Sequence, residues 1–142
     1  MGIRCTCQHG PLECEKNSLQ SCVISYFPET DTHLEIVNCI QGASEFDESV
    51  QKCLVEHKPP LRVPSDRLVR CALSDGGRSL MGYHGVVQHY RASRLQWVPW
   101  IVINGVRDNE AERDLKRVLC TRYLKPRPSI CEAYPIDPTE PI

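Results

Sequence analysis

Apolar residues recur every three or four positions through the first two thirds of the chain, which is the period of an amphipathic helix. The segment from Cys5 to Lys16 reads as an irregular loop, because Gly10-Pro11 interrupts regular structure. Asn17 then caps a helix that ends before Pro28. The residues expected to face inward from this helix are Leu19, Cys22, Val23 and Tyr26.

Four more helical segments follow in the same pattern. The first of them is capped by Asp31, and its inward residues are expected to be Leu34, Val37 and Cys39 or Ile40. The second spans Glu45–Glu56. The third is a short helix that begins at Ser65-Asp66 and is closed by Gly76-Gly77, and the fourth spans Leu80–Tyr90. The polar linker Lys58-Pro59-Pro60 separates the second of these from the third.

The sequence pattern changes from helical to strand-like in the last third of the chain. The run Val98–Ile103 is β-branched and aromatic, which predicts a strand, and Asn104-Gly105 after it is typical of a type I′ hairpin turn. A short partner strand is expected at Val106-Arg107, followed by a last helix over Glu110–Tyr123. The Pro-rich segment from Lys125 predicts an extended or loose tail.

Composition narrows the class of protein. The chain has 142 residues, one domain's worth, and a net charge of -1, which offers no electrostatic reason to expect a nucleic-acid partner. No apolar run approaches the roughly 20 residues that span a bilayer. Nine cysteines indicate an oxidising compartment, yet the first residues lack the apolar core of a secretory signal, which suggests that this is not the natural N-terminus. Met1-Gly2 and Thr6 also fit the myristoylation pattern, although so short a pattern recurs by chance.

One motif is far more specific than the rest. It reads C-Q-H-G-x2-E-C-x2-N-x4-C and consists of Cys7, Gln8, His9, Gly10, Glu13, Cys14, Asn17 and Cys22. It resembles the signature of the gamma-interferon-inducible lysosomal thiol reductase (GILT) family. The block Trp97–Gly105 is similar to that family's V-P-W strand leading into an N-G hairpin. The resemblance therefore extends from Cys7 to about Cys131.

The resemblance implies a thioredoxin-like α/β domain over residues 1–131, with a Pro-rich tail over 132–142. It implies disulfide reduction of proteins without a cofactor, in a lysosomal or extracellular setting, with disulfide-containing or extended polypeptides as partners. In thioredoxin-like folds the proline equivalent to Pro99 is cis, and the backbone of the residue before it, here Val98, pairs with the substrate as an added strand.

The catalytic C-x-x-C of that family is absent from these 142 residues. In the family it lies in a first β-α-β unit before the signature, and only six residues precede Cys7. The expected fold is therefore a truncated, mostly helical version with one antiparallel hairpin and an open strand edge. No catalytic residue is assigned, and enzymatic activity stays open. The alternative is a non-catalytic polypeptide-binding protein or a structural, disulfide-stapled secreted protein.

Two other sites near the signature are weaker. Cys5-Thr6-Cys7 is a possible redox pair, but a bond across one residue is strained, and Gly10-Pro11 stands where an activating helix start would be needed. Cys5, Cys7, His9 and Cys14 do not match zinc-ligand spacing, so no metal is expected. Loop-tying hydrogen bonds are favoured over catalysis for the polar signature residues. The other cysteines read as structural, and their pairing cannot be deduced from sequence.

Overall fold

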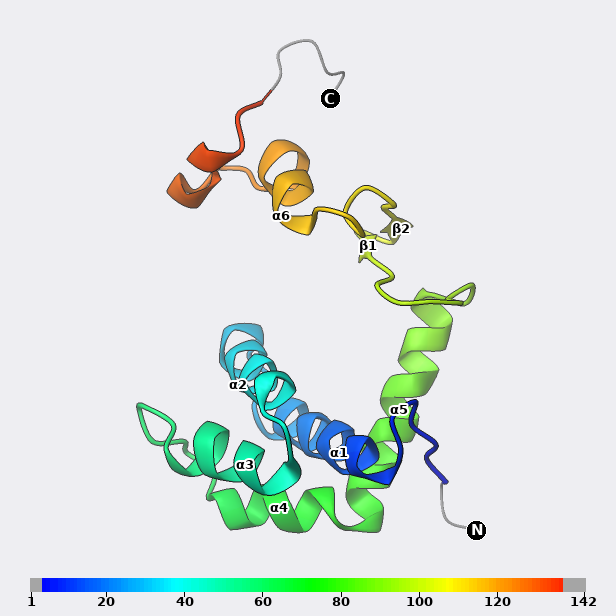
Figure 1. Ribbon diagram of the computed structural model, residues 1–142, viewed down its shortest axis with the longest axis vertical. Helices are drawn as coiled ribbons and strands as arrows, with labels where there is room; N and C mark the ends of the chain where they lie inside the picture. Colours follow the sequence, from blue (N-terminus) through cyan, green and yellow to red (C-terminus); the bar gives the residue numbers. More distant parts are fainter. Residues whose placement is uncertain (1–3, 137–142) are drawn as a thin grey trace. The chain divides into compact units, whose positions relative to one another are not determined.

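A computed structural model describes residues 4–136 (Figure 1). The chain divides into two compact units, Met1–Gln88 and His89–Ile142, and each is described by itself. The described residues form a mostly helical protein with one two-stranded antiparallel hairpin, as expected at that level. The myristoylation pattern at Met1-Gly2 lies outside the described residues.

The first helix, α1, runs over Pro11–Tyr26 and so begins well before the expected cap at Asn17. Gly10 stands before it with a φ of 95°, and Pro11 is its first residue. Proline interrupts a helix interior but suits the first turn, where its missing N–H would have no partner in any case. The prediction that Gly10-Pro11 breaks regular structure and leaves no helix start near Cys14 is therefore wrong.

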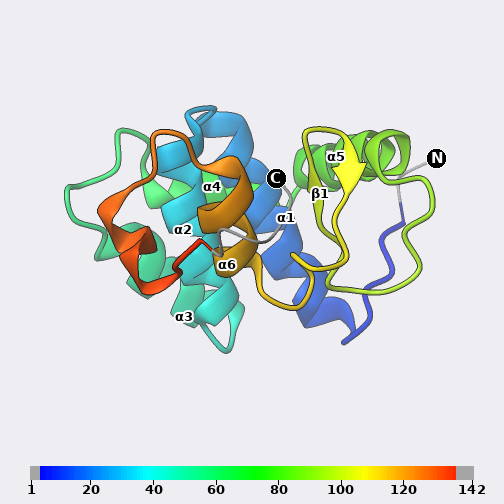
Figure 2. The same ribbon diagram turned by 90° about the horizontal axis from the view of Figure 1, so that it is seen from above.

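Three further elements pack around α1 in the first unit: α2 (Thr30–Gly42), α3 (Phe46–Val50) and α4 (Ser65–Ala72). Figures 1 and 2 both show α2 running beside α1. The π-helix η1 (Gln51–Val55) continues α3 without a break, so together they occupy nearly the whole of the predicted Glu45–Glu56 helix.

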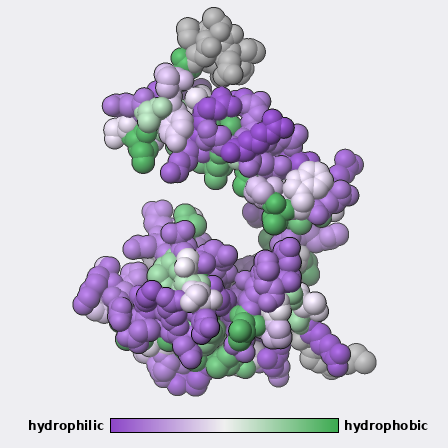
Figure 3. Space-filling view, viewed as in Figure 1, coloured by the Kyte–Doolittle hydropathy of each residue, from purple (hydrophilic) through white to green (hydrophobic). Residues whose placement is uncertain are grey.

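The core of this unit is formed by the inward stripes of these helices. Its buried side chains are Leu19, Cys22, Val23, Phe27, Ile36, Ile40, Cys53, Leu54, Leu68 and Ala72. Leu34, expected to be inward, is 60% exposed, because α2 turns Ile36 and Ile40, four residues apart, toward the core instead. Outside this core the face seen in Figure 3 is largely hydrophilic with scattered hydrophobic patches.

Helix α5 (Asp75–Arg91) contains the glycine pair that was expected to end α4. Gly77 is buried, and an added Cβ there would lie 2.3 Å from Ser18 Oγ and 2.6 Å from the Cys71 carbonyl oxygen. The Ser18 hydroxyl donates to the Ala72 carbonyl at 2.7 Å, so this contact joins α1 to the end of α4. Glycine is therefore present for close helix packing, and the prediction that it closes the helix is wrong.

In the second unit, strands β1 (Val102–Ile103) and β2 (Val106–Arg107) pair antiparallel. Asn104 and Gly105 have φ values of 51° and 82°, as the type I′ turn requires. The paired part of the predicted Val98–Ile103 strand is shorter than expected, because β2 offers only two partner residues.

The last predicted helix, Glu110–Tyr123, is also shortened. Helix α6 spans Leu115–Val118 and continues as the π-helix η2, Leu119–Tyr123. Asp108 holds the preceding segment in a turn, since its Oδ1 accepts the backbone N–H groups of Glu110 and Ala111 at 3.0 and 2.9 Å. Asp114 then caps α6 by accepting the N–H of Arg117 at 3.0 Å.

The segment after Lys125 is tied down by a 3-10 helix, η3 (Ser129–Ala133), and a disulfide from Cys131 to Cys120. Arg127 donates to the carbonyl oxygens of Cys120 and Cys131 at 3.1 and 2.5 Å. The expected loose tail is therefore wrong for this stretch. The predicted tail over 132–142 stays a prediction, and residues 137–142 lie outside the described part. Among the described helices, none is long and apolar enough to cross a membrane.

Candidate functional site

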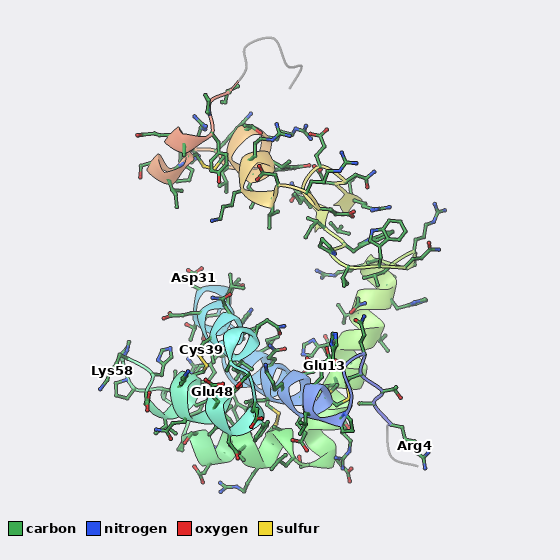
Figure 4. All side chains as sticks on the ribbon, in the orientation of Figure 1. Arg4, Glu13, Asp31, Cys39, Glu48 and Lys58 are labelled. Carbon is green, nitrogen blue, oxygen red and sulfur yellow. A yellow bond between two sulfur atoms is a disulfide. The ribbon has the colours of Figure 1, made fainter. Side chains whose placement is uncertain are left out.

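Four disulfides connect the described helices and loops, and they show that most of the cysteines are structural, as expected. They join Cys7 to Cys14, Cys22 to Cys71, Cys39 to Cys53, and Cys120 to Cys131. The Cys22–Cys71 bond links α1 to α4, and the Cys39–Cys53 bond links α2 to η1. Figure 4 labels Cys39 on α2. Cys5 is the one unpaired cysteine of residues 4–136.

The polar signature residues form a tied loop at the start of α1. Glu13 lies in the first turn of the helix (Figure 4), and its Oε2 accepts the backbone N–H of His9 at 2.6 Å. Its Oε1 lies 3.1 Å from His9 Nδ1. The pKa of the Glu13 carboxyl is lowered, chiefly by the backbone hydrogen bond from His9 and then by the ring contact. This geometry agrees with a loop-tying role for His9 and Glu13, whereas Gln8 is exposed.

The disulfide pairing of the signature cysteines differs from the Cys5–Cys7 redox pair considered above. Cys7 bonds to Cys14 across the helix start, so Cys5 and Cys7 are not paired with each other. Asn17, expected as a helix cap, lies inside α1, and its Nδ2 contacts Cys7 Sγ at 3.8 Å. Within the described residues, no group of three or more Cys, His, Asp or Glu side chains is arranged to hold a metal ion.

Val98 and Pro99 lie in the second unit, and the peptide bond between them is cis. Val98 is 73% exposed, and the backbone of this residue makes no hydrogen bond to any residue of the described 4–136 range. Its N–H and C=O groups are therefore free to pair with an added strand.

Two tryptophans flank this dipeptide and form a platform with one arginine. The rings of Trp97 and Trp100 meet edge to face with centroids 5.1 Å apart. The Arg107 guanidinium lies 4.7 Å from the Trp97 centroid and 3.7 Å from the Trp100 centroid. Cations over aromatic faces are attracted by the ring quadrupole, so Arg107 orders both rings.

Glu112 also binds this arginine. Its two carboxylate oxygens accept from Arg107 Nε at 2.8 Å and from a terminal nitrogen at 3.0 Å. This fork lowers the pKa of Glu112 and raises the pKa of Arg107, the hydrogen bond being the largest cause of each shift. Each partner therefore favours the charged form of the other.

Beside this platform is a positively charged hollow of about 290 Å³. Its charged lining residues are Arg91, Arg94 and Arg107, with Ser93 and Trp100. No acidic side chain borders it among the lining residues, so it favours a carboxylate or another anion.

Sequence reasoning predicts substrate binding at Val98 and Pro99, which stays a prediction, and it missed the contacts that Arg107 and Glu112 make. The hairpin pattern contained a signal for Arg107. The turn pairs Arg107 with Val102, and strand alternation places Trp100 on the same face as Val102, diagonally next to Arg107. No comparable local signal marks Glu112, which lies in an irregular turn.

Comparison with known proteins adds an independent finding. The family model described as "Gamma interferon inducible lysosomal thiol reductase (GILT)" matches residues 1–57. A GILT-like protein of Caenorhabditis briggsae is 39% identical over 129 residues, covering 91% of this chain and 57% of that protein. A GILT-like protein of Caenorhabditis elegans is 38% identical over 129 residues, covering 91% of this chain and 58% of its own.

More distant relatives bear the full family name. The gamma-interferon-inducible lysosomal thiol reductase of Mus musculus is 26% identical over 129 residues, covering 90% of this chain and 50% of that protein. The chain thus spans between half and three fifths of the length of these three relatives.

Proposed function

The chain belongs to the gamma-interferon-inducible lysosomal thiol reductase (GILT) family, and on that premise we propose that it serves in the reduction of protein disulfides by holding the polypeptide substrate. The substrate is a disulfide-containing polypeptide in extended form. The fold is thioredoxin-like, and the place of action is a lysosomal or extracellular compartment. The four disulfides suit such an oxidising setting.

The observation that carries the proposal is the unpaired backbone of Val98 beside Pro99. An extended substrate strand forms main-chain hydrogen bonds there and packs against the half-exposed Trp97. Arg107 and Glu112 keep Trp97 in place.

The electrons for reduction come from a dithiol, because reducing one substrate disulfide consumes two electrons and two protons. These 142 residues contain no C-x-x-C. A dithiol outside them therefore attacks the substrate disulfide, forms a mixed disulfide, and is itself oxidised to a disulfide when its second thiol releases the reduced substrate. Without such a dithiol the chain binds polypeptide but does not reduce it, which is the second candidate function.

The test compares two substitutions at Val98. Val98→Pro removes the backbone N–H that a substrate strand would accept from, whereas Val98→Ala keeps it. Binding of a reduced, alkylated and fluorescently labelled polypeptide is measured by anisotropy at pH 5. One lost main-chain hydrogen bond is worth about 1 kcal/mol, so Val98→Pro is expected to weaken binding roughly fivefold, with Val98→Ala close to the unchanged chain. Equal binding by both variants would reject strand addition at Val98.

A second assay separates reduction from holding. A denatured protein disulfide is incubated at pH 5 with a synthetic C-x-x-C peptide, with and without the chain. A faster loss of the disulfide that requires Val98 backbone pairing supports participation in reduction. Binding without any change in the rate of reduction supports the holding function alone.

A further inference from the structure

Cys5, whose thiol is unpaired, lines the same hollow as the two cysteines of the Cys7–Cys14 disulfide. A hollow of about 220 Å³ is bordered by Cys5, Cys7 and Cys14 together with the short loop between them. A second hollow of about 430 Å³ is again bordered by Cys5 and Cys14. Cys5 is half-buried, and it is two residues before Cys7. Cys5, Cys7 and Cys14 therefore line one common hollow.

The surroundings distinguish the two sulfurs of that bond. Attack by Cys5 on Cys7 would create a bond across a single residue, which strains disulfide geometry. Attack on Cys14 instead closes a longer loop and releases Cys7. The released sulfur of Cys7 retains the Asn17 amide, whose Nδ2 lies 3.8 Å from it and donates to it. Hydrogen-bond donation to a departing thiolate favours its release.

We propose that Cys5, Cys7 and Cys14 form a thiol–disulfide exchange centre of this chain, independent of the polypeptide-binding proposal. Cys5 gives its proton to water, and its thiolate forms a bond to Cys14 Sγ. The Cys7–Cys14 bond breaks, its electron pair leaves with Cys7, and the Cys7 thiolate takes up a proton. One thiol and one disulfide are present before and after, so no oxidant or reductant is consumed. The free thiol moves between positions 5 and 7.

The helix start at Pro11 supports this arrangement. Cys14 lies in the first turn of the 16-residue helix α1, whereas Cys5 and Cys7 lie in the preceding loop. The loop then changes partner while the helix stays in place.

The test maps the disulfides of the 142-residue chain. The protein is held at pH 8 for increasing times, quenched with acid, alkylated, and analysed by peptide mass spectrometry. We expect a Cys5–Cys14 peptide to appear together with alkylated Cys7, and to appear far more slowly at pH 4.5, because the thiolate is the attacking species. Alkylation of Cys5 alone at all times, or a bond between two copies of Cys5 as the sole new product, would overturn the proposal.

Two variants sharpen the result, with folding checked by circular dichroism. Cys5→Ser removes the attacking thiol, so Cys7 should never become alkylated. Cys7→Ser leaves Cys5 and Cys14 as the two thiols, and with oxidised glutathione as oxidant they should join to each other. Failure of that bond to form in folded Cys7→Ser protein, or alkylation of Cys7 in the Cys5→Ser variant, would also contradict the exchange centre.

Discussion

Loss of the Cys22–Cys71 disulfide is expected to lower the free energy of unfolding of the first unit more than loss of the Cys39–Cys53 disulfide. The first bond joins residues 49 apart and the second joins residues 14 apart. A cross-link stabilises chiefly by restricting the unfolded chain, by about 4 kcal/mol for the longer loop and about 3 kcal/mol for the shorter. The ratio of the two loop lengths corresponds to a difference of about 1.1 kcal/mol.

The two bonds form a matched pair in other respects. Each joins one almost fully buried cysteine, Cys22 or Cys53, to a half-buried one. Replacing both partners with alanine therefore removes similar buried sulfur from each site. The difference between the two double variants then reports loop closure rather than packing.

The assay is urea unfolding at pH 4.5, where thiol exchange by Cys5 is slow. Circular dichroism at 222 nm follows the helices, most of which lie in the first unit, whereas tryptophan fluorescence follows Trp97 and Trp100 in the second. Equal losses for the two variants, or a larger loss without Cys39–Cys53, would refute the loop-length argument. A chain unfolded without Cys22–Cys71 but folded without Cys39–Cys53 would agree with it.

Three further substitutions test the close helix contact, one surface carboxylate and the tryptophan platform. Gly77→Ala forces a Cβ against Ser18 and should lower the free energy of unfolding by ~1–3 kcal/mol. Gly85→Ala on the same helix places its Cβ in open space and should raise the free energy of unfolding by up to about 1 kcal/mol. Thermal unfolding measures both variants, and equal effects would contradict the packing argument. The hydrogen bond from Lys52 is the largest cause that lowers the pKa of the Glu48 carboxyl to about 2. The ionised Glu48 carboxylate therefore stabilises the folded chain fully above pH ~4.5, and this stabilisation is lost as pH falls through 2. Glu48→Gln should therefore lower urea stability at pH 6 but not at pH 2, and a loss that persists at pH 2 would reject the ion pair as its cause. Arg107→Lys removes the planar stacking on both indoles and should change the tryptophan emission spectrum, unlike Arg94→Lys; an unchanged spectrum would mean that Arg107 does not order the rings.

Local sequence signals were sufficient to predict structure where a residue type favours a single backbone conformation. The Asn104-Gly105 turn was predictable because both positions need positive φ, which few residue types adopt. The start of α4 at Ser65 also agrees with the prediction, and Asp66 lies in its first turn, where acidic residues favour a helix start, although no side chain caps this helix. The family motif was readable for a related reason, since it depends on residue identities rather than on packing.

Local signals failed where one residue has two uses. Gly10-Pro11 either breaks a chain or begins a helix, and the hydrogen bond from His9 to Glu13 accompanies the second outcome. Gly77 either ends a helix or admits a neighbour, and the approach of Ser18 and Cys71 decided for the second. Both decisions depend on residues that the local pattern does not include.

The amino-acid order alone specified the family motif, the hairpin turn and a cysteine content suited to an oxidising compartment. Tertiary packing decided which cysteines are bonded, that Cys5 is left unpaired, and that Arg107 lies over both tryptophan rings. The physical reason is distance: a disulfide needs Cα atoms within about 7 Å and a stacked guanidinium needs a ring within about 6 Å. Separation along the chain does not determine either distance, whereas the packing of helices and the register of a hairpin do.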